Sequence, residues 1–392
     1  MNLQLPQDAV IGRKMLDLLR PGRGGAYPHF YLIDAVRGLA AVAVLFWHYQ
    51  HFFYPRALEK IDGYSTSNLP LYDYFFILYE YGFYAVQIFW VISGFVFAAV
   101  YVGTKATSRS FFINRFARLY PLHFITLVIV AVLQSVSWYA LGYHQIYGNN
   151  DPYHFILNLV FASTWGLEKG PSFNDPIWSV SVEVLVYAAF WTSIPFLDRR
   201  GLVGPLALAA SALMAFFLQL GPNGFIWSCA FHFFTGTAAF VFFDRFSSQP
   251  SLIAGTGGLA LVAGALALWQ FPERSIIGLG GAIVGFVLLV ASFELNGAAR
   301  HARKVAWIGD STYGIYLWHV PIQIAGLIVL DVLGIGREIA RSPLFLIGFL
   351  TITVTVGYAS FRFIENPSRK GIRNALDVPN PKSRRLQETM AE

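Results

Sequence analysis

The sequence predicts an all-α polytopic integral membrane protein with about ten transmembrane helices. The 392-residue chain is 56% hydrophobic and 13% charged, whereas soluble domains carry about 25% charged residues. Apolar runs of about 20 residues, the length of one helical membrane crossing, recur along the whole chain. The loops between these runs alternate between basic and nearly neutral, as loops on the two sides of a membrane do.

Each expected crossing is an apolar run that ends at glycine, proline or charged residues. The fourth run begins at a good helix start, because Asn174 or Asp175 can cap the helix and Pro176 fits its first position. In chain order, the ten runs are 32–53, 81–102, 119–141, 177–197, 202–220, 225–243, 252–271, 276–293, 313–333 and 344–363.

The charges of the loops predict that both termini are cytoplasmic. Arginine and lysine gather in the N-terminal arm, in every second loop and after the last run, and such residues stay on the cytoplasmic side. Arg337 and Arg341 fall on the outer side and are the weak exception. We therefore expect a cytoplasmic arm over 1–30, one transmembrane domain over 31–370 and a cytoplasmic tail over 371–392.

Several classes of function are disfavoured by the composition. The single cysteine, Cys229, excludes an intrachain disulfide and a multi-cysteine metal site. The sequence contains no nucleotide-binding loop, no zinc-protease motif and no serine-hydrolase elbow. The net charge of +6 is concentrated on one side of the membrane, which does not suit a nucleic-acid partner. We expect no metal and no tightly bound cofactor.

The first apolar run carries Asp34, Arg37 and His48 where lipid-facing residues are expected. Ionisable groups at membrane depth are costly, and they are functional candidates by default. Arg37 and His48 are eleven positions apart, so they share one helix face with about 16 Å between them along the axis. Asp34 lies one turn before Arg37 and is expected to pair with it.

Arg115 and Arg118 lie one helical turn apart at the predicted cytoplasmic mouth of the third run. Two guanidinium groups on one face suit phosphate groups, which they bind with paired hydrogen bonds. The alternative is that both arginines only anchor the helix at the membrane surface.

Glu183 and His319 are the other ionisable candidates within the apolar runs. Glu183 is expected about 9 Å below the outer surface, close to the depth of His48, so the two could form an acid–base pair. The alternative for Glu183 is a structural carboxyl held by a hydroxyl or an indole. His319 precedes Pro321 and is expected to bond a backbone carbonyl that the proline frees.

Four motifs in order make the chain resemble the bacterial membrane acyltransferase-3 family, which includes polysaccharide O-acetyltransferases. The resemblance covers about residues 31–370, and Val184 departs from it because many relatives carry a second glutamate there. The motifs are Arg37 with His48 and the preceding Asp34, residues 86–95 with Ser93, residues 115–121 with Arg115 and Arg118, and residues 178–187 with Trp178, Glu183 and Tyr187.

The resemblance implies an acyl-CoA co-substrate, usually acetyl-CoA, and an acceptor hydroxyl on an envelope glycan or glycolipid. It places residues 31–370 in a transmembrane acyltransferase domain of the bacterial inner membrane, in contact with lipids. His48 would be the general base and Glu183 its partner, while Arg37, Arg115, Arg118 and Asp34 would hold the donor. Possible cavity-lining residues are Ser93, Trp178, Tyr187 and His319.

Two alternatives compete with this interpretation. A transporter or flippase could use the buried Asp34, Arg37, His48 and Glu183 as a substrate or proton path, although no internal repeat is visible. A different class of membrane acyltransferase would place its histidine outside the first membrane helix. For the acceptor we expect contacts from the outer loop 142–175, which is rich in aromatic and amide side chains: His144, Tyr147, Asn149, Asn150, Asp151, Tyr153 and Trp165.

Overall fold

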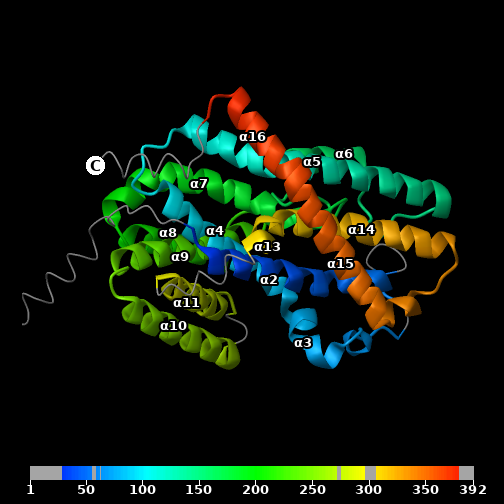
Figure 1. Ribbon diagram of the computed structural model, residues 1–392, viewed down its shortest axis with the longest axis horizontal. Helices are drawn as coiled ribbons and strands as arrows, with labels where there is room; N and C mark the ends of the chain where they lie inside the picture. The colour runs from blue at the N-terminus through cyan, green and yellow to red at the C-terminus, as the bar shows by residue number, and fades with distance from the viewer. Residues whose placement is uncertain (1–28, 55–58, 62, 272–274, 296–305, 379–392) are drawn as a thin grey trace, which may run out of the picture.

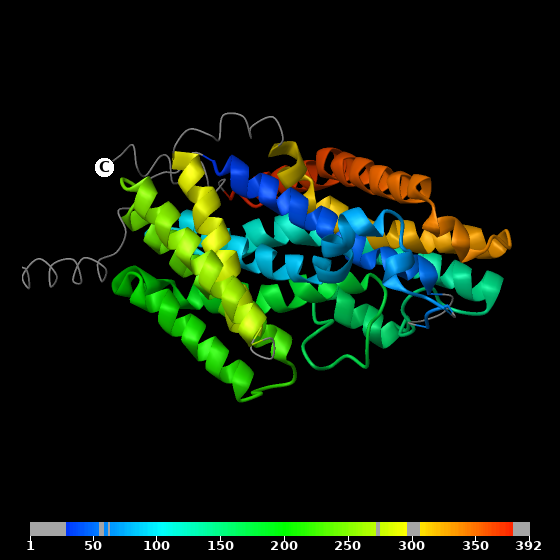
Figure 2. The same cartoon turned by 90° about the horizontal axis from the view of Figure 1, so that it is seen from below.

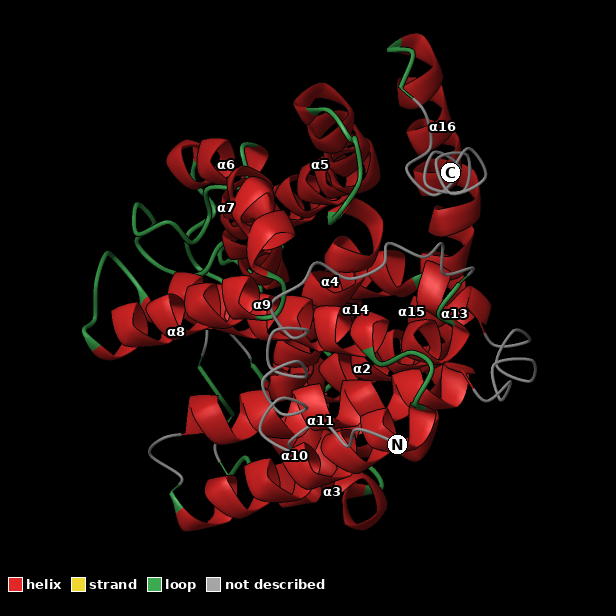
Figure 3. Ribbon diagram, turned by 90° about the vertical axis from the view of Figure 1, so that its left-hand side faces the viewer, coloured by secondary structure: helices red, strands yellow, loops and turns green. Residues whose placement is uncertain are grey.

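The computed structural model describes residues 29–54, 59–61, 63–271, 275–295 and 306–378. These residues form a bundle of helices without a strand (Figure 3), which confirms the predicted all-α class. Almost all of the expected N-terminal arm, and the tail from residue 379 onward, lie outside the described residues.

Nine helices in the described part of the chain are long and apolar enough to cross a membrane, so the polytopic class is confirmed as well. The α-helices of the described residues, short ones included, are α2 (Tyr31–His48), α3 (Tyr72–Tyr81), α4 (Ala85–Tyr101), α5 (Ser108–Leu141), α6 (Pro152–Leu159), α7 (Trp178–Arg200), α8 (Val203–Phe217), α9 (Gly224–Arg245), α10 (Pro250–Gln270), α11 (Ser275–Leu295), α13 (Ala306–Asp310), α14 (Thr312–Val332), α15 (Pro343–Ser360) and α16 (Asn366–Ala375).

Each of the ten predicted runs coincides with one of these helices. The fifth run corresponds to α8, an apolar helix of 15 residues that is shorter than the nine candidate membrane spans of the described chain. The helices α3, α6 and α16 lie almost entirely outside the predicted apolar runs. The helix α5 begins well before its predicted run and has 34 residues, about 51 Å in length, so it extends beyond the roughly 30 Å apolar layer of a membrane.

The helices α2, α5 and α14 run in one direction and form the frame of the site. Near their starts, the Tyr313 hydroxyl donates to the Leu119 carbonyl at 2.9 Å. Near their other ends, the Tyr143 hydroxyl and the Gln145 amide donate to Asp331. The end where these three helices begin is called the arginine-rich end here, because α7 and α9 also finish there on arginines.

Glycine brings α4 and α9 into contact at the centre of the bundle. A Cβ atom on Gly94 would clash with the Phe233 carbonyl, and one on Gly236 would clash with the Val91 carbonyl. Small residues of this kind let membrane helices approach backbone to backbone. Outside this core, α11 packs against α9, α4 and α2, and α10 packs on α11 (Figures 1 and 2).

The C-terminal segment packs against the bundle as far as residue 378. A π-helical turn, Phe361–Glu365, joins α15 to α16, and the two form one rod that crosses α5 (Figure 1). The Arg109 guanidinium on α5 donates to the Leu376 carbonyl at 2.6 Å, where α16 ends. This contact satisfies a carbonyl that has no partner within its own helix.

Candidate active site: an arginine cavity and a histidine cluster

A cavity of about 340 Å³ opens into the arginine-rich end of the bundle, between α2, α4, α5, α7, α14 and α16. Charged side chains line it, and arginines outnumber acids among them. These residues are Asp34, Arg37, Arg115, Arg118, Glu183, Asp310, Arg369 and Arg373. The space is called the arginine cavity below.

The predicted pair of Asp34 and Arg37 forms one wall of the arginine cavity. The Arg37 Nη1 atom lies 3.2 Å from Asp34 Oδ1, one turn earlier on α2. The other oxygen of Asp34 lies 2.9 Å from the His29 Nε2 atom. Asp34 therefore fixes the Arg37 guanidinium in place and lowers the cost of keeping it inside the bundle.

The Arg115 and Arg118 side chains point into the bundle instead of lying along its surface. The Arg115 guanidinium carbon lies 4.7 Å above the Phe97 ring, in cation–π geometry. Arg118 is close enough to Arg37, Arg115 and Arg369 for their charges to repel, with Glu365 as the nearby acid. An anchoring role alone does not account for several arginines gathered around one space.

Glu183 lies in the arginine cavity and not beside His48. The Ser93 and Tyr187 hydroxyls and the charges of Arg37 and Arg115 surround its carboxyl group. The Oε1 atom of Glu183 is buried and has no hydrogen-bond partner among the described residues.

This position differs from the predicted acid–base pair of Glu183 and His48, and the reason lies in where the two helices begin and end. The segment before α7 folds into the bundle, where Asn174, Pro176 and Ile177 are buried, so Glu183 starts deeper than a count from the surface suggests. His48 is the last residue of α2 and lies farther toward the opposite end.

Of the four expected cavity-lining residues, Trp178 does not line the arginine cavity itself, but its ring lies 5.8 Å from that of Trp90, which does. Ser93 and Tyr187 line the arginine cavity, and His319 lies beyond its inner end. Trp178 is instead packed in the core, 4.7 Å from the Phe225 ring and stacked on Phe83. Its large aromatic surface is better satisfied there than in a polar cavity.

His48, His51 and His319 form a second group toward the opposite end of the bundle, called the histidine cluster below. The His48 ring centroid lies 5.0 Å from that of His51 and 4.8 Å from that of His319. Gln323 on α14 connects the group, because its amide donates to the His48 carbonyl at 2.8 Å and its oxygen lies 3.3 Å from His51 Nδ1. The cluster thus joins the end of α2 to the middle of α14.

Hydrogen bonds to backbone carbonyls fix the tautomers of His48 and His319. His48 Nδ1 lies 3.0 Å from the Val44 carbonyl, and His319 Nδ1 lies 2.6 Å from the Tyr316 carbonyl. A carbonyl oxygen only accepts, so in each ring Nδ1 carries the hydrogen, and the Nε2 atom of a neutral ring offers a lone pair. His319 Nε2 is buried and has no partner among the described residues.

Pro321 affects the backbone near His319 in a different way from the one predicted. Proline removes the hydrogen bond to the carbonyl four residues earlier, which belongs to Leu317. The Asn174 side chain donates to this Leu317 carbonyl at 2.9 Å. His319 does bond a carbonyl, as expected, but it is the Tyr316 carbonyl and not the one that Pro321 frees.

Tyr316 separates the arginine cavity from the histidine cluster. It lines the inner end of the cavity, and its ring centroid lies 5.9 Å from that of His319. Its hydroxyl donates to the Pro176 carbonyl at 2.6 Å and lies 2.7 Å from Ser179 Oγ. The two halves of the site are therefore adjacent along α14.

The loop 142–175 uses most of its amide side chains to hold itself together. Asn149 donates to the Pro171 carbonyl, and Asn150 both donates to the Tyr147 carbonyl and accepts from the Phe173 amide. Tyr147 is the loop residue that reaches the histidine cluster, with its ring 5.6 Å from His51. Burial, aided by the charge of Asp175, raises the pKa of Tyr147 well above its usual value, so the phenol stays protonated.

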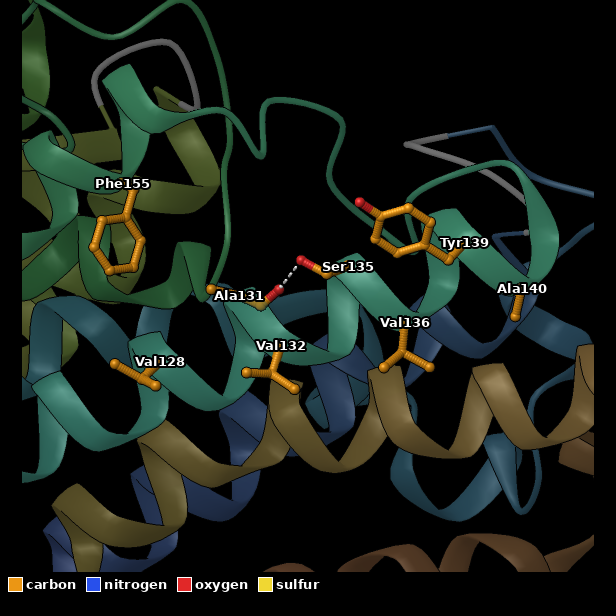
Figure 4. Close-up of a pocket in the computed structure, with 8 residues that line it drawn as sticks. All are labelled: Val128, Ala131, Val132, Ser135, Val136, Tyr139, Ala140 and Phe155. Carbon is orange, nitrogen blue, oxygen red and sulfur yellow. Dashed lines mark hydrogen bonds between the residues drawn. The ribbon is translucent and has the colours of Figure 1, made fainter.

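A hollow of about 620 Å³ lies elsewhere, on the outward face of α5 (Figure 4). Valine and alanine line most of it, with Phe155 from α6 at one edge. Its Ser135 hydroxyl donates to the Ala131 carbonyl within the same helix, at 2.9 Å. No charged side chain lines the hollow, and we assign no chemistry to it.

Some residues of the site were not singled out from the sequence. Gln323 and Tyr316 gave no signal there, because single polar side chains within apolar runs are common. Arg369 and Arg373 were counted only as positive charges of the tail. Their spacing of four residues, which places them on one face of a helix, was the signal that could have identified them.

Comparisons with known proteins agree with the sequence motifs. The family model described as an acyltransferase domain matches residues 30–362. The chain is 25% identical to the peptidoglycan O-acetyltransferase OatA of Listeria monocytogenes, over 86% of this chain and 55% of that protein. It is 26% identical to the exopolysaccharide production protein ExoZ of Rhizobium meliloti, over 72% of this chain and 88% of that protein.

A third relative is the acyltransferase MdmB of Streptomyces mycarofaciens, 32% identical over 59% of this chain and 52% of that protein. The chain thus spans about half the length of OatA and of MdmB. No solved structure gives a significant match to the chain.

Proposed function

Because the chain belongs to the acyltransferase family whose model covers residues 30–362, we propose that it is a membrane O-acetyltransferase. In this proposal an acyl group, usually acetyl, passes from acyl-CoA at the cytoplasmic face to a sugar hydroxyl of an envelope or exported glycan. The names of OatA and ExoZ support a polysaccharide acceptor. The nine long apolar helices suit a multi-pass protein of the bacterial inner membrane.

The arginine cavity supports a phosphorylated donor. Arg37, Arg115 and Arg118 line one space inside the bundle, and guanidinium groups bind phosphate with paired, charge-assisted hydrogen bonds. Arg37 and His48 lie about 16 Å apart along α2, comparable to the extended pantetheine arm of coenzyme A. A donor whose phosphates lie at the arginines would present its thioester near the histidine cluster.

His48 is suited to be the general base. Its Nδ1 hydrogen is held by Val44, so Nε2 can take the proton of the acceptor hydroxyl. The hydroxyl oxygen then attacks the thioester carbonyl, the new C–O ester bond forms and the C–S bond breaks. The proton passes from His48 to the departing sulfur, which leaves as the free thiol of coenzyme A.

A single observation carries the proposal: the arginine cavity and the histidine cluster meet at Tyr316. A phosphate site and a general base at the two ends of one path are what transfer from a cytoplasmic donor requires. The Glu183 carboxyl, which lies among the arginines, is assigned to the donor side of the path.

The test uses the purified chain in detergent, where no gradient exists, with labelled acetyl-CoA and a glycan fraction as acceptor. Transfer of label to the glycan supports the enzyme. Uptake that occurs only in sealed vesicles, with no transfer in detergent, supports the transporter. Mass analysis of glycans from cells with and without this chain identifies the acceptor.

A further inference from the structure

We infer that Arg369 and Arg373 of α16 form a second phosphate subsite, which takes the ribose 3′-phosphate of coenzyme A. The inference rests on the proposed function, because it names the part of the donor that this face of the arginine cavity would recognise. It also gives α16 a role in binding that its position after the last membrane crossing does not suggest.

The two arginines form a unit distinct from the deeper ones. They lie four residues apart, on one face of α16, and both line the arginine cavity. Arg369 is the one arginine whose charge lies close to Arg373. Arg118, in contrast, lies close to the charges of Arg37, Arg115 and Arg369. The arginines therefore run from a deep group to a pair at the rim.

The rim pair is held in place without being neutralised. Arg109 on α5 fastens the end of α16 through the Leu376 carbonyl, and Arg369 Nη2 lies 3.4 Å from Asn366 Oδ1. Glu365 lies near Arg369, but among the described residues Arg373 forms no ion pair. A cation fixed beside a like charge, and facing a cavity, favours an anionic ligand.

Coenzyme A presents two separate phosphate groups that match these two sets of arginines. Its pyrophosphate leads directly into the pantetheine arm, so it belongs with the deep group on the path to His48. Its 3′-phosphate is a dianion on the ribose, on the far side of the pyrophosphate from the thioester, and so belongs nearer the rim. Acyl groups carried on phosphopantetheine alone lack this 3′-phosphate.

The experiment measures the binding of coenzyme A and of 3′-dephospho-coenzyme A to the full chain, in nanodiscs without anionic lipid. We expect the unaltered chain to prefer coenzyme A by about tenfold or more, since each charge-assisted phosphate contact is strong. Arg373→Gln and Arg369→Gln should each weaken coenzyme A binding by about tenfold and leave dephospho-coenzyme A binding unchanged. Glutamine keeps the helix propensity of α16.

Lys370→Gln is the matched control, because Lys370 is an exposed cation of α16 that does not line the cavity. We expect it to change neither affinity. Equal weakening of both ligands in the arginine variants would overturn the inference and leave the proposed donor intact. Loss of the preference for coenzyme A only when anionic lipid is added would show that a lipid headgroup competes for the same phosphate subsite, which supports it. Failure of the unaltered chain to bind coenzyme A would overturn both proposals.

Discussion

The imidazole rings of His48 and His319 lie with their centroids 4.8 Å apart, one at the end of α2 and the other in the middle of α14. The contact brings together two histidines that are remote in the sequence. Both rings carry their hydrogen on Nδ1, held by a backbone carbonyl. The pair therefore offers two acceptor nitrogens beyond Tyr316, which lines the arginine cavity.

Replacement of His48 by glutamine should stop acyl transfer. Glutamine can fill much of the space but cannot take the proton, and a positioned general base contributes about 10²- to 10⁴-fold. We expect kcat to fall by at least about a hundredfold and the affinity for coenzyme A to stay unchanged. The measurement is transfer of labelled acetyl by the purified variant, together with donor binding.

His232→Gln is the matched control for this variant. His232 is buried on α9 and bonds the carbonyl four residues earlier, Ser228, at 2.7 Å, in the same way as His48 bonds Val44. If both variants lose activity together, loss of a buried imidazole and not loss of the base explains the result. Full activity of His48→Gln would remove His48 from the mechanism.

Replacement of Arg118 by glutamine should weaken donor binding. Arg118 lies deep in the arginine cavity among other arginines, and loss of its charge-assisted phosphate contacts should raise the KM for acetyl-CoA by about tenfold or more. The kcat at saturating donor should change little. Arg199→Gln, an exposed arginine at the same end of the bundle, should leave both constants unchanged. An unaltered KM in Arg118→Gln would exclude the phosphate role.

Replacement of Glu183 should strengthen donor binding, whereas replacement of Arg118 should weaken it. Its carboxyl lies close to Arg37 and Arg115, so it competes with a bound phosphate for their charge. Glu183→Gln should tighten coenzyme A binding several-fold at low ionic strength, and the gain should shrink as salt screens the charges. Coenzyme A binding that does not change in Glu183→Gln would contradict this competition between the carboxyl group and the phosphate.

The membrane helices could be predicted because a 20-residue apolar run has few structures available to it in a lipid environment. The pairing of Asp34 with Arg37 could be predicted for a related reason, since it depends only on spacing within one helix. Contacts between helices were not predictable in this way. The depth of Glu183 depends on how the segment before α7 folds into the bundle, and no local pattern encodes that.

The end of the described chain is a second region whose structure depends on contacts that no local sequence pattern predicts. Residues 366–375 are polar and follow the last apolar run, so composition assigned half of them, 371–375, to a cytoplasmic tail. Their structure is decided by contacts with α5, among them the bond from Arg109 to Leu376. Arg337 is similar: its charge looked like an exception to the loop pattern, but Asp331 neutralises it at 2.6 Å. Contacts between distant parts of the chain decide where these charged side chains lie and what they bind.

The orientation of the chain can be tested with introduced cysteines, because the only native one, Cys229, is buried. Lys169 and Lys370 are both exposed, at opposite ends of the bundle. A membrane-impermeant maleimide should label Lys169→Cys in intact cells, and label Lys370→Cys only after the membrane is opened. The unaltered chain should stay unlabelled in both conditions. The reverse pattern would place the arginine cavity outside and contradict a cytoplasmic donor.

Gln323 should affect the chemical step without contacting the donor. Its amide donates to the His48 carbonyl at the end of α2, and its oxygen faces His51. Gln323→Leu leaves both partners unsatisfied in a buried setting, a loss of about 1–3 kcal/mol, and frees the end of α2 to move. We expect a lower unfolding temperature and a kcat reduced by about tenfold, with coenzyme A affinity retained.

Gln50→Leu is the control for Gln323→Leu. Gln50 belongs to the turn just after His48, but its side chain bonds only locally and does not connect two helices: its amide donates to the Trp47 carbonyl at 3.0 Å, and its oxygen accepts from the Tyr54 hydroxyl at 3.1 Å. Its removal should alter stability and kcat only slightly, because both lost contacts are local and partly open to solvent. If the two glutamine variants lose activity equally, the end of α2 is sensitive to any change, and the link from α14 to His48 has no special role. A selective loss in Gln323→Leu means that α14 holds the general base in position.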